Sequence, residues 1–85
     1  MIKDKSEVDI ILPNYNSERF IDQTLKSVIN QSFKNWKLII VDDASNPKTK
    51  SQLLKYRKHP KIKIFFLSRN RGAGFCRNFA IKNSF

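Results

Sequence analysis

The sequence predicts an α/β fold, a Rossmann-like β-α-β-α-β-α arrangement that forms half of a three-layer domain with parallel strands in the order 3-2-1. Three apolar runs, at residues 8–12, 37–41 and 62–67, alternate with three amphipathic stretches. No repeat, low-complexity tract or linker interrupts this alternation, and 85 residues suffice for one small domain. Because right-handed crossovers join consecutive parallel strands, the helices are expected to cover the sheet.

The first strand is expected over residues 8–12, and Pro13 should end it because proline cannot donate to a sheet ladder. Ser17 is then a suitable N-cap for the first helix, with Glu18 near the positive end of that helix. This helix should end near Gln31. Its apolar stripe consists of Ile21, Leu25, Val28 and Ile29.

The second strand is expected over residues 37–41, and a second helix over residues 47–58. Asn46 and Pro47 form the start of that helix, as an N-cap followed by a first-turn proline whose missing N–H costs nothing. Pro60 then prevents the helix from continuing.

The third strand should cover residues 62–67, and the last helix should start near Ala73. One side of that helix carries Phe75, Cys76, Phe79 and Ala80. Cys76 is therefore expected to be a small buried thiol rather than a nucleophile. His59 lies beside a proline in a loop, where we expect it to be solvated rather than to act as a ligand.

The chain carries a formal charge of +10, from 17 Lys and Arg against 7 Asp and Glu. This charge favours an anionic partner, and a nucleotide, a nucleic acid and an acidic membrane surface all fit it. Residues 55–61 form the densest basic stretch, which fits either a solvated helix end or attraction to acidic lipid. One cysteine excludes an internal disulfide, the first residues lack a signal peptide, and no apolar run approaches the roughly 20 residues of a membrane span. We expect a cytoplasmic protein, either free or peripheral at the inner face of the membrane.

Three polar loops, at residues 13–17, 42–46 and 68–72, should leave the same edge of the predicted sheet. The carboxyl edge of an open α/β sheet is where such folds bind ligands. The first of these loops has no glycine, so we do not expect it to hold a pyrophosphate directly against its backbone.

Several side chains at this edge suit a nucleotide. Tyr15 offers a flat face on which a base can stack, and Asp43 offers an acceptor for a base N–H or a ribose hydroxyl. The alternative for Asp42 and Asp43 is that each only caps the second helix. Arg77, one turn into the last helix, is placed to reach the same edge and neutralise a phosphate.

Two other classes of protein remain open on these observations. A non-catalytic module that binds nucleotides or nucleic acid would explain the charge, but it should gather Lys and Arg on one face with aromatic residues between them. Here they are scattered along the chain. A generic doubly wound protein, such as a signalling receiver or a reductase fragment, is the other class, although the glycines of the reductase type are missing.

Five short motifs follow one another along the chain. They are VDIILPNYN at residues 8–16, Leu25 with Ser27 and Gln31, IIVDDAS at residues 39–45, Asn70-x-Gly72, and Arg77-Asn78. In this order and spacing they resemble family 2 glycosyltransferases of the GT-A fold, over almost the whole chain. The resemblance implies the nucleotide-binding half of a GT-A domain and a nucleotide-diphosphate sugar as donor, most often linked to UDP. It also implies transfer with inversion to a glycan or lipid-linked acceptor of the cell envelope.

The resemblance assigns roles to individual residues. Tyr15 matches the aromatic position beside the base, and Asp43 matches the carboxylate that contacts the uracil. Pro13, Asn16 and Asp42 match the family positions that shape the same pocket. Arg77 matches the basic residue near the donor. Cys76 stands where the family usually has alanine, which leaves these roles unchanged.

The resemblance also implies what residues 1–85 lack. The family's metal-binding D-x-D carboxylates and its catalytic base lie beyond the helix of Arg77, and the sequence ends at Phe85 before either. We therefore expect a donor-binding N-terminal part of the domain with no catalytic residue and no metal ligand. The complete enzyme would use Mg²⁺ or Mn²⁺ held by residues outside this chain. The chain alone should be inactive, bind no specific nucleic acid, and self-associate through the open edge of its first strand.

Overall fold

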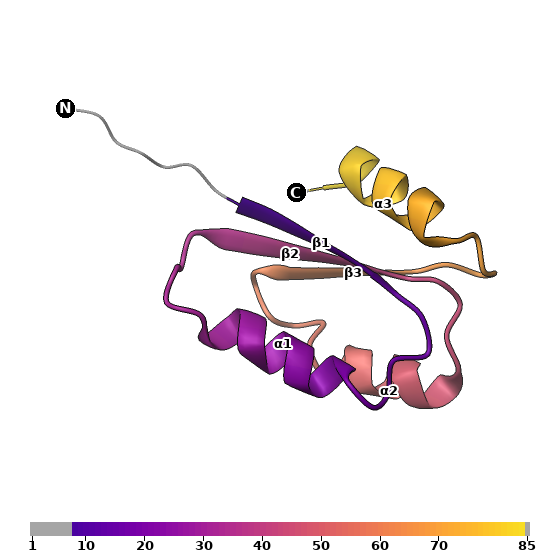
Figure 1. Cartoon of the computed structure of the whole chain (residues 1–85), viewed down its shortest axis with the longest axis horizontal. Helices are drawn as coiled ribbons and strands as arrows, with labels where there is room; N and C mark the ends of the chain where they lie inside the picture. The colour runs from indigo at the N-terminus through magenta and orange to yellow at the C-terminus, as the bar shows by residue number, and fades with distance from the viewer. Residues whose placement is uncertain (1–7, 85) are drawn as a thin grey trace.

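Three parallel strands in the order β1-β2-β3 form the sheet of the computed structural model, which describes residues 8–84. They are β1 (Val8–Asn14), β2 (Trp36–Asp42) and β3 (Ile62–Phe66). Helices α1 (Ile21–Asn30) and α2 (Pro47–Leu54) cover one face, and α3 (Ala73–Lys82) covers the other (Figure 1). This confirms the predicted α/β class and the strand order 3-2-1. The first seven residues, and with them the predicted absence of a signal peptide, lie outside the described residues.

β2 is the middle strand, and its alternate residues are buried in two different clusters. The cluster beneath α1 and α2 contains Ile21, Leu25, Trp36, Leu38, Ile40, Leu53 and Ile62. The cluster beneath α3 contains Ile39, Val41, Cys76 and Ala80. A strand buried on both faces needs apolar side chains at successive positions, which explains the continuous run at residues 38–41.

β1 continues past the proline that was expected to end it. Pro13 pairs in register with Val41, and Asn14 pairs with Asp42. Within residues 8–84, β1 is an edge strand with β2 as its neighbour. An edge strand tolerates proline because the missing N–H can belong to the open side of the strand. The prediction that Pro13 stops the strand is therefore wrong, and the strand delivers Asn14 to the carboxyl edge.

The start of α1 also differs from the prediction. Ser17 is not the N-cap: residues 18–20 form a turn, Phe20 occupies the cap position, and no side chain caps the helix. The Ser17 hydroxyl instead donates to Oδ1 of Asn14. The Glu18 carboxylate lies at the start of α2 rather than α1, where it accepts from the Thr49 hydroxyl at 2.8 Å. Ser17 thus bonds to a residue at the end of β1, and Glu18 bonds to a distant helix, instead of capping α1.

α2 begins as predicted and ends earlier. Asn46 is its N-cap, with Oδ1 accepting from the Thr49 N–H at 2.8 Å, and Pro47 lies in the first turn. The helix ends at Leu54, and residues 55–58 form turns instead of helix. β3 ends at Phe66 instead of residue 67, and α3 begins at the expected residue. None of the helices between residues 8 and 84 is long and apolar enough to cross a membrane.

Candidate functional site

The three polar loops meet at the carboxyl edge of the sheet, as the sequence predicts; we call this edge the rim. In Figure 1 it lies at the right, where the chain leaves each strand. Hydrogen bonds join the loops to one another. The Asp43 N–H donates to the Asn14 carbonyl at 2.8 Å, and the Asn70 side chain donates to the Asp43 carbonyl at 3.2 Å. The rim is therefore one connected unit built from residues far apart in the sequence.

Asp42 is fully buried and uses both carboxylate oxygens inside the protein. Its Oδ1 accepts from Asn14 Nδ2 at 3.0 Å and from Ser45 Oγ at 2.6 Å, while its Oδ2 accepts from the Ser45 N–H at 3.0 Å. These bonds close the turn after β2 and fix the end of β1. Asp42 does not cap α2, because Asn46 occupies that position.

Asp43 is 4% exposed, and its carboxylate points towards the start of α3. Oδ1 accepts from the Arg71 N–H at 2.6 Å, and Oδ2 accepts from the Gly72 N–H at 2.8 Å. An acidic group at the N-terminus of a helix is favourable because the helix dipole is positive there. Gly72 is the N-cap of α3 with φ of 92°, a backbone conformation that side chains oppose. Asp43 therefore holds the third loop against β2, and neither aspartate caps the second helix.

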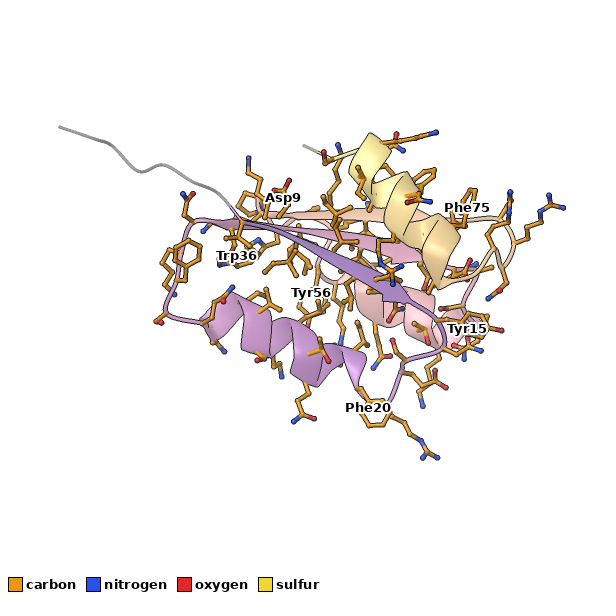
Figure 2. All side chains as sticks on the ribbon, turned by 45° about the horizontal axis from the view of Figure 1, so that its top comes forward. Asp9, Tyr15, Phe20, Trp36, Tyr56 and Phe75 are labelled. Atoms are coloured by element: carbon orange, nitrogen blue, oxygen red, sulfur yellow. The ribbon has the colours of Figure 1, made fainter. Side chains whose placement is uncertain are left out.

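A small open pocket of about 100 Å³ lies beside Asp43. It is lined by Pro13, Asn14, Tyr15, Asp43 and Ala73. Tyr15 is 54% exposed, and Figure 2 shows it at the rim end of the molecule, far from Trp36 at the other end of the sheet. Ligand pockets for whole small molecules are usually about 300–1,000 Å³. A hollow of this size suits the edge of one planar ring between an exposed tyrosine and a buried carboxylate.

Asn16 lies at the rim but outside the pocket lining. Its N–H donates to Ser45 Oγ at 2.8 Å, and its side-chain oxygen accepts from the Asn46 N–H at 2.8 Å. Asn16 has φ of 46°, in the left-handed region that asparagine tolerates better than most residues. The Ser45 hydroxyl thus connects the first loop to the second, a role that the sequence analysis did not assign.

The structure brings together some of the predicted site residues and separates others. Three of the six, Pro13, Tyr15 and Asp43, line the pocket. Asp42 and Asn16 support the loops from behind it. Arg77 is exposed on α3 and does not line the pocket. The pocket residues that sequence reasoning missed are Asn14 and Ala73. Asn14 would have been found if the first strand had been continued through the proline.

Cys76 lies in the core beneath α3, fully buried. Burial first, and then the negative charge and hydrogen bonding of Asp43, raise the pKa of the Cys76 thiol to about 11. The thiol therefore stays protonated at neutral pH, as expected for a buried residue that is not a nucleophile.

The rim does not fit a divalent cation. Among residues 8–84, no group of three or more His, Cys, Asp or Glu side chains is arranged to hold a metal ion. The adjacent carboxylates of Asp42 and Asp43 already accept hydrogen bonds on all four oxygens. Two neighbouring carboxylates do not by themselves make such a group, so no step of chemistry at this rim is assigned to a metal.

Comparison with known proteins identifies the family. The model of glycosyl transferase family 2 matches residues 9–85. The chain belongs to this family. It is 38% identical over 81 residues to TuaG of Bacillus subtilis, which is described as a teichuronic acid biosynthesis glycosyltransferase, and the match covers 94% of this chain and 32% of TuaG. It is 36% identical over 75 residues to the UDP-glucose:α-D-GlcNAc-diphosphoundecaprenol β-1,3-glucosyltransferase WfgD of Escherichia coli, covering 88% of this chain and 29% of WfgD.

Solved structures of family members share the fold. TarS of S. aureus in complex with UDP-GlcNAc superimposes with a TM-score of 0.83 at 34% identity, covering 94% of this chain and 24% of the TarS chain. The mannosyltransferase PcManGT of Pyrobaculum calidifontis, solved with GDP-Man and Mn²⁺, has a TM-score of 0.82 at 22% identity, which shows a common fold. The chain therefore spans 14% of the length of TarS, 29% of WfgD and 32% of TuaG.

Proposed function

We propose that this chain is the donor-binding part of a glycosyltransferase that moves a sugar from a UDP-sugar to a glycan or lipid-linked acceptor of the cell envelope. The family is shown by the match over residues 9–85. The choice of UDP is supported by TarS, solved with UDP-GlcNAc, and by WfgD, whose name gives UDP-glucose as its donor and a diphosphoundecaprenol-linked acceptor. We also keep the predicted cytoplasmic location, free or peripheral at the inner face of the membrane, as part of this proposal.

The observation that carries the proposal is the buried Asp43 carboxylate beside an exposed tyrosine. Each carboxylate oxygen accepts one backbone N–H, and the Cys76 thiol is a third donor to this carboxylate, which leaves one of its four lone-pair positions for a ligand. Two fixed N–H donors hold this acceptor in one orientation, so that a base N–H placed in the pocket meets a preorganised partner. Tyr15 then covers the face of the base, and Pro13 closes the side of the pocket.

The remaining predicted residues act around this contact. Asp42 and Asn16 keep the first two loops in place through Ser45. Arg77 is exposed on the same helix that follows Gly72, and we keep it as the cation that meets the donor diphosphate. The diphosphate also needs a divalent cation, and the acceptor hydroxyl needs a base; we assign both to residues outside this chain.

Nuclear magnetic resonance titration of the chain tests this proposal. UDP should shift the amide signals of Tyr15, Asp43 and Ala73 in the pocket, and ADP at the same concentration should shift them much less. Amides of the opposite end, such as that of Trp36, serve as the internal control. Equal shifts with UDP and ADP, or shifts spread over the whole chain, would contradict a base-selective pocket.

A further inference from the structure

A basic surface lies at the end of the sheet opposite the rim. It consists of Lys34, Arg57, Lys58 and Lys61, and it comes from the segment before β2 and the segment before β3. Lys61 joins the two segments, because its ammonium group donates to the Lys34 carbonyl and lies 5.0 Å from the centre of the Trp36 ring. His59 stacks on the same ring, with 6.0 Å between centroids. Figure 2 shows Trp36 at this end and Tyr15 at the other.

Between residues 8 and 84, no carboxylate forms an ion pair with the basic surface. Lys55, which precedes it, pairs with Asp22 at 3.4 Å. Over the described part of the chain, the four cations of the basic surface have no such ion pair. Like charges gathered without counter-charges repel one another, and an anionic partner removes that repulsion.

The aromatic side chains at this end favour a lipid surface over a nucleic acid. Single-stranded nucleic acids bind to basic grooves in which several exposed rings stack with bases. Here the Trp36 ring is only 2% exposed, and it is already packed against His59 and Lys61. Phe33 is the exposed ring next to the basic surface, at 48% exposure. One apolar side chain beside several cations is the composition of a peripheral membrane contact.

We propose that the basic surface binds the phosphate-bearing headgroups of an acidic membrane, with Phe33 entering the headgroup region. Each Lys or Arg close to such a membrane strengthens binding about fivefold. Because the surface and the rim lie at opposite ends of the strands, a bound membrane leaves the rim in solvent. Membrane binding is therefore independent of the proposed nucleotide site, and each of the two proposals can fail without the other.

The test is co-sedimentation of the chain with vesicles. Vesicles of phosphatidylglycerol mixed with phosphatidylcholine should bind the chain, and vesicles of phosphatidylcholine alone should not. The double variant Arg57→Gln, Lys58→Gln should bind the acidic vesicles about 25-fold more weakly. The control variant Lys48→Gln, Lys50→Gln removes the same charge from the start of α2 and should bind within a few-fold of wild type. The side chains of Arg57 and Lys58 are exposed, so their loss should leave thermal unfolding unchanged.

A second variant tests the apolar contact. Phe33→Ser should weaken binding about fivefold, since roughly half of the ring is available for burial. Equal loss in the two double variants would overturn the proposal, because general charge would then explain binding. Equal binding to both kinds of vesicle would overturn it as well. Displacement of the chain from acidic vesicles by a single-stranded RNA at low concentration would assign the surface to nucleic acid instead.

Discussion

An Asp43→Asn substitution should strongly reduce the preference for UDP over a UDP analogue methylated at N3 of the base. In the proposed complex, the N3–H of uracil donates to the buried carboxylate, and methylation removes that donor. A hydrogen bond to a charged group contributes about 1.5–3 kcal/mol, which corresponds to about 10- to 150-fold in Kd. Because Asp43 is 4% exposed, solvent has little access to replace the lost bond. The wild-type chain should therefore prefer UDP by about this factor, and the variant, which lacks the charged acceptor, should show a much smaller preference.

The substitution also affects folding, and the ligand pair separates the two effects. An asparagine keeps one acceptor oxygen, so its amide group faces the N–H of either Arg71 or Gly72 without a bond. We expect the free energy of unfolding to fall by about 1–3 kcal/mol. Both ligands meet the same folded variant, however, so the ratio of their Kd values reports base recognition alone.

Gly72→Ala is the matched control for this experiment. The new Cβ would meet no atom within 4 Å, so its effect is confined to the strain of φ at 92°. The variant should lose stability but keep the preference for UDP, because the Asp43 carboxylate remains. Calorimetry with both ligands measures the two ratios. An unchanged ratio in the Asp43→Asn variant would show that Asp43 only holds the third loop, and the proposed contact with the base would be refuted.

Four further predictions concern other parts of the molecule. Ser45→Ala should lower the free energy of unfolding by about 1–3 kcal/mol, because the Asn16 N–H loses its acceptor, and Ser45→Thr should restore most of it in thermal unfolding. Since the pKa of Cys76 is about 11 instead of 9.0, iodoacetamide should react with the folded chain at least about 100-fold more slowly than with the urea-unfolded chain. For the same reason the free energy of unfolding should fall as pH rises from 9 towards 11, because the thiol of the unfolded chain ionises first. The chain with UDP-glucose or UDP-N-acetylglucosamine and Mn²⁺ should release UDP no faster than buffer does; metal-dependent turnover would show that the catalytic groups are misplaced. The open edge of β1 should make the chain self-associate at micromolar concentration, and a monodisperse monomer in sedimentation that melts above about 60 °C would contradict this.

The fold could be predicted because its strongest signals are local. The continuous apolar run of β2 predicts a strand that is buried on both faces, and the apolar stripe of α1 predicts a helix with one buried side. The structure buries both as expected. The ends of elements were less predictable. Pro13 stays within β1 because the strand is at an edge, and Ser17 gives up the helix cap because Asn14 offers it a partner. The first outcome depends on the place of β1 in the sheet. The second depends on the Asn14 side chain, which also donates to Asp42 of the neighbouring strand.

The site shows the same division between local and distant causes. The two adjacent carboxylates at a strand exit indicated a ligand edge, and the exposed tyrosine of the first loop lies there. The sequence could not reveal that Ser45 receives a bond from Asn16, 29 residues earlier. Nor could it show that the third loop supplies backbone donors rather than a side chain to Asp43.

Asp42 and Asp43 differ in function because Asp42 is the last residue of β2, Asp43 follows the strand, and their carboxylates bond to different segments. Asp42 Oδ1 accepts from Asn14 of the neighbouring strand and from the Ser45 hydroxyl, and its Oδ2 accepts from the Ser45 N–H, so this carboxylate joins β1 to β2 and closes the turn that follows. Asp43 meets the loop before α3, and its two backbone donors and the Cys76 thiol leave one lone-pair position beside a pocket that is open to solvent. An ion that needed both carboxylates would therefore need two groups that are held by different segments of the chain. A single planar ring needs only Asp43, and this is the geometric reason for assigning a base rather than a metal to this edge of the chain.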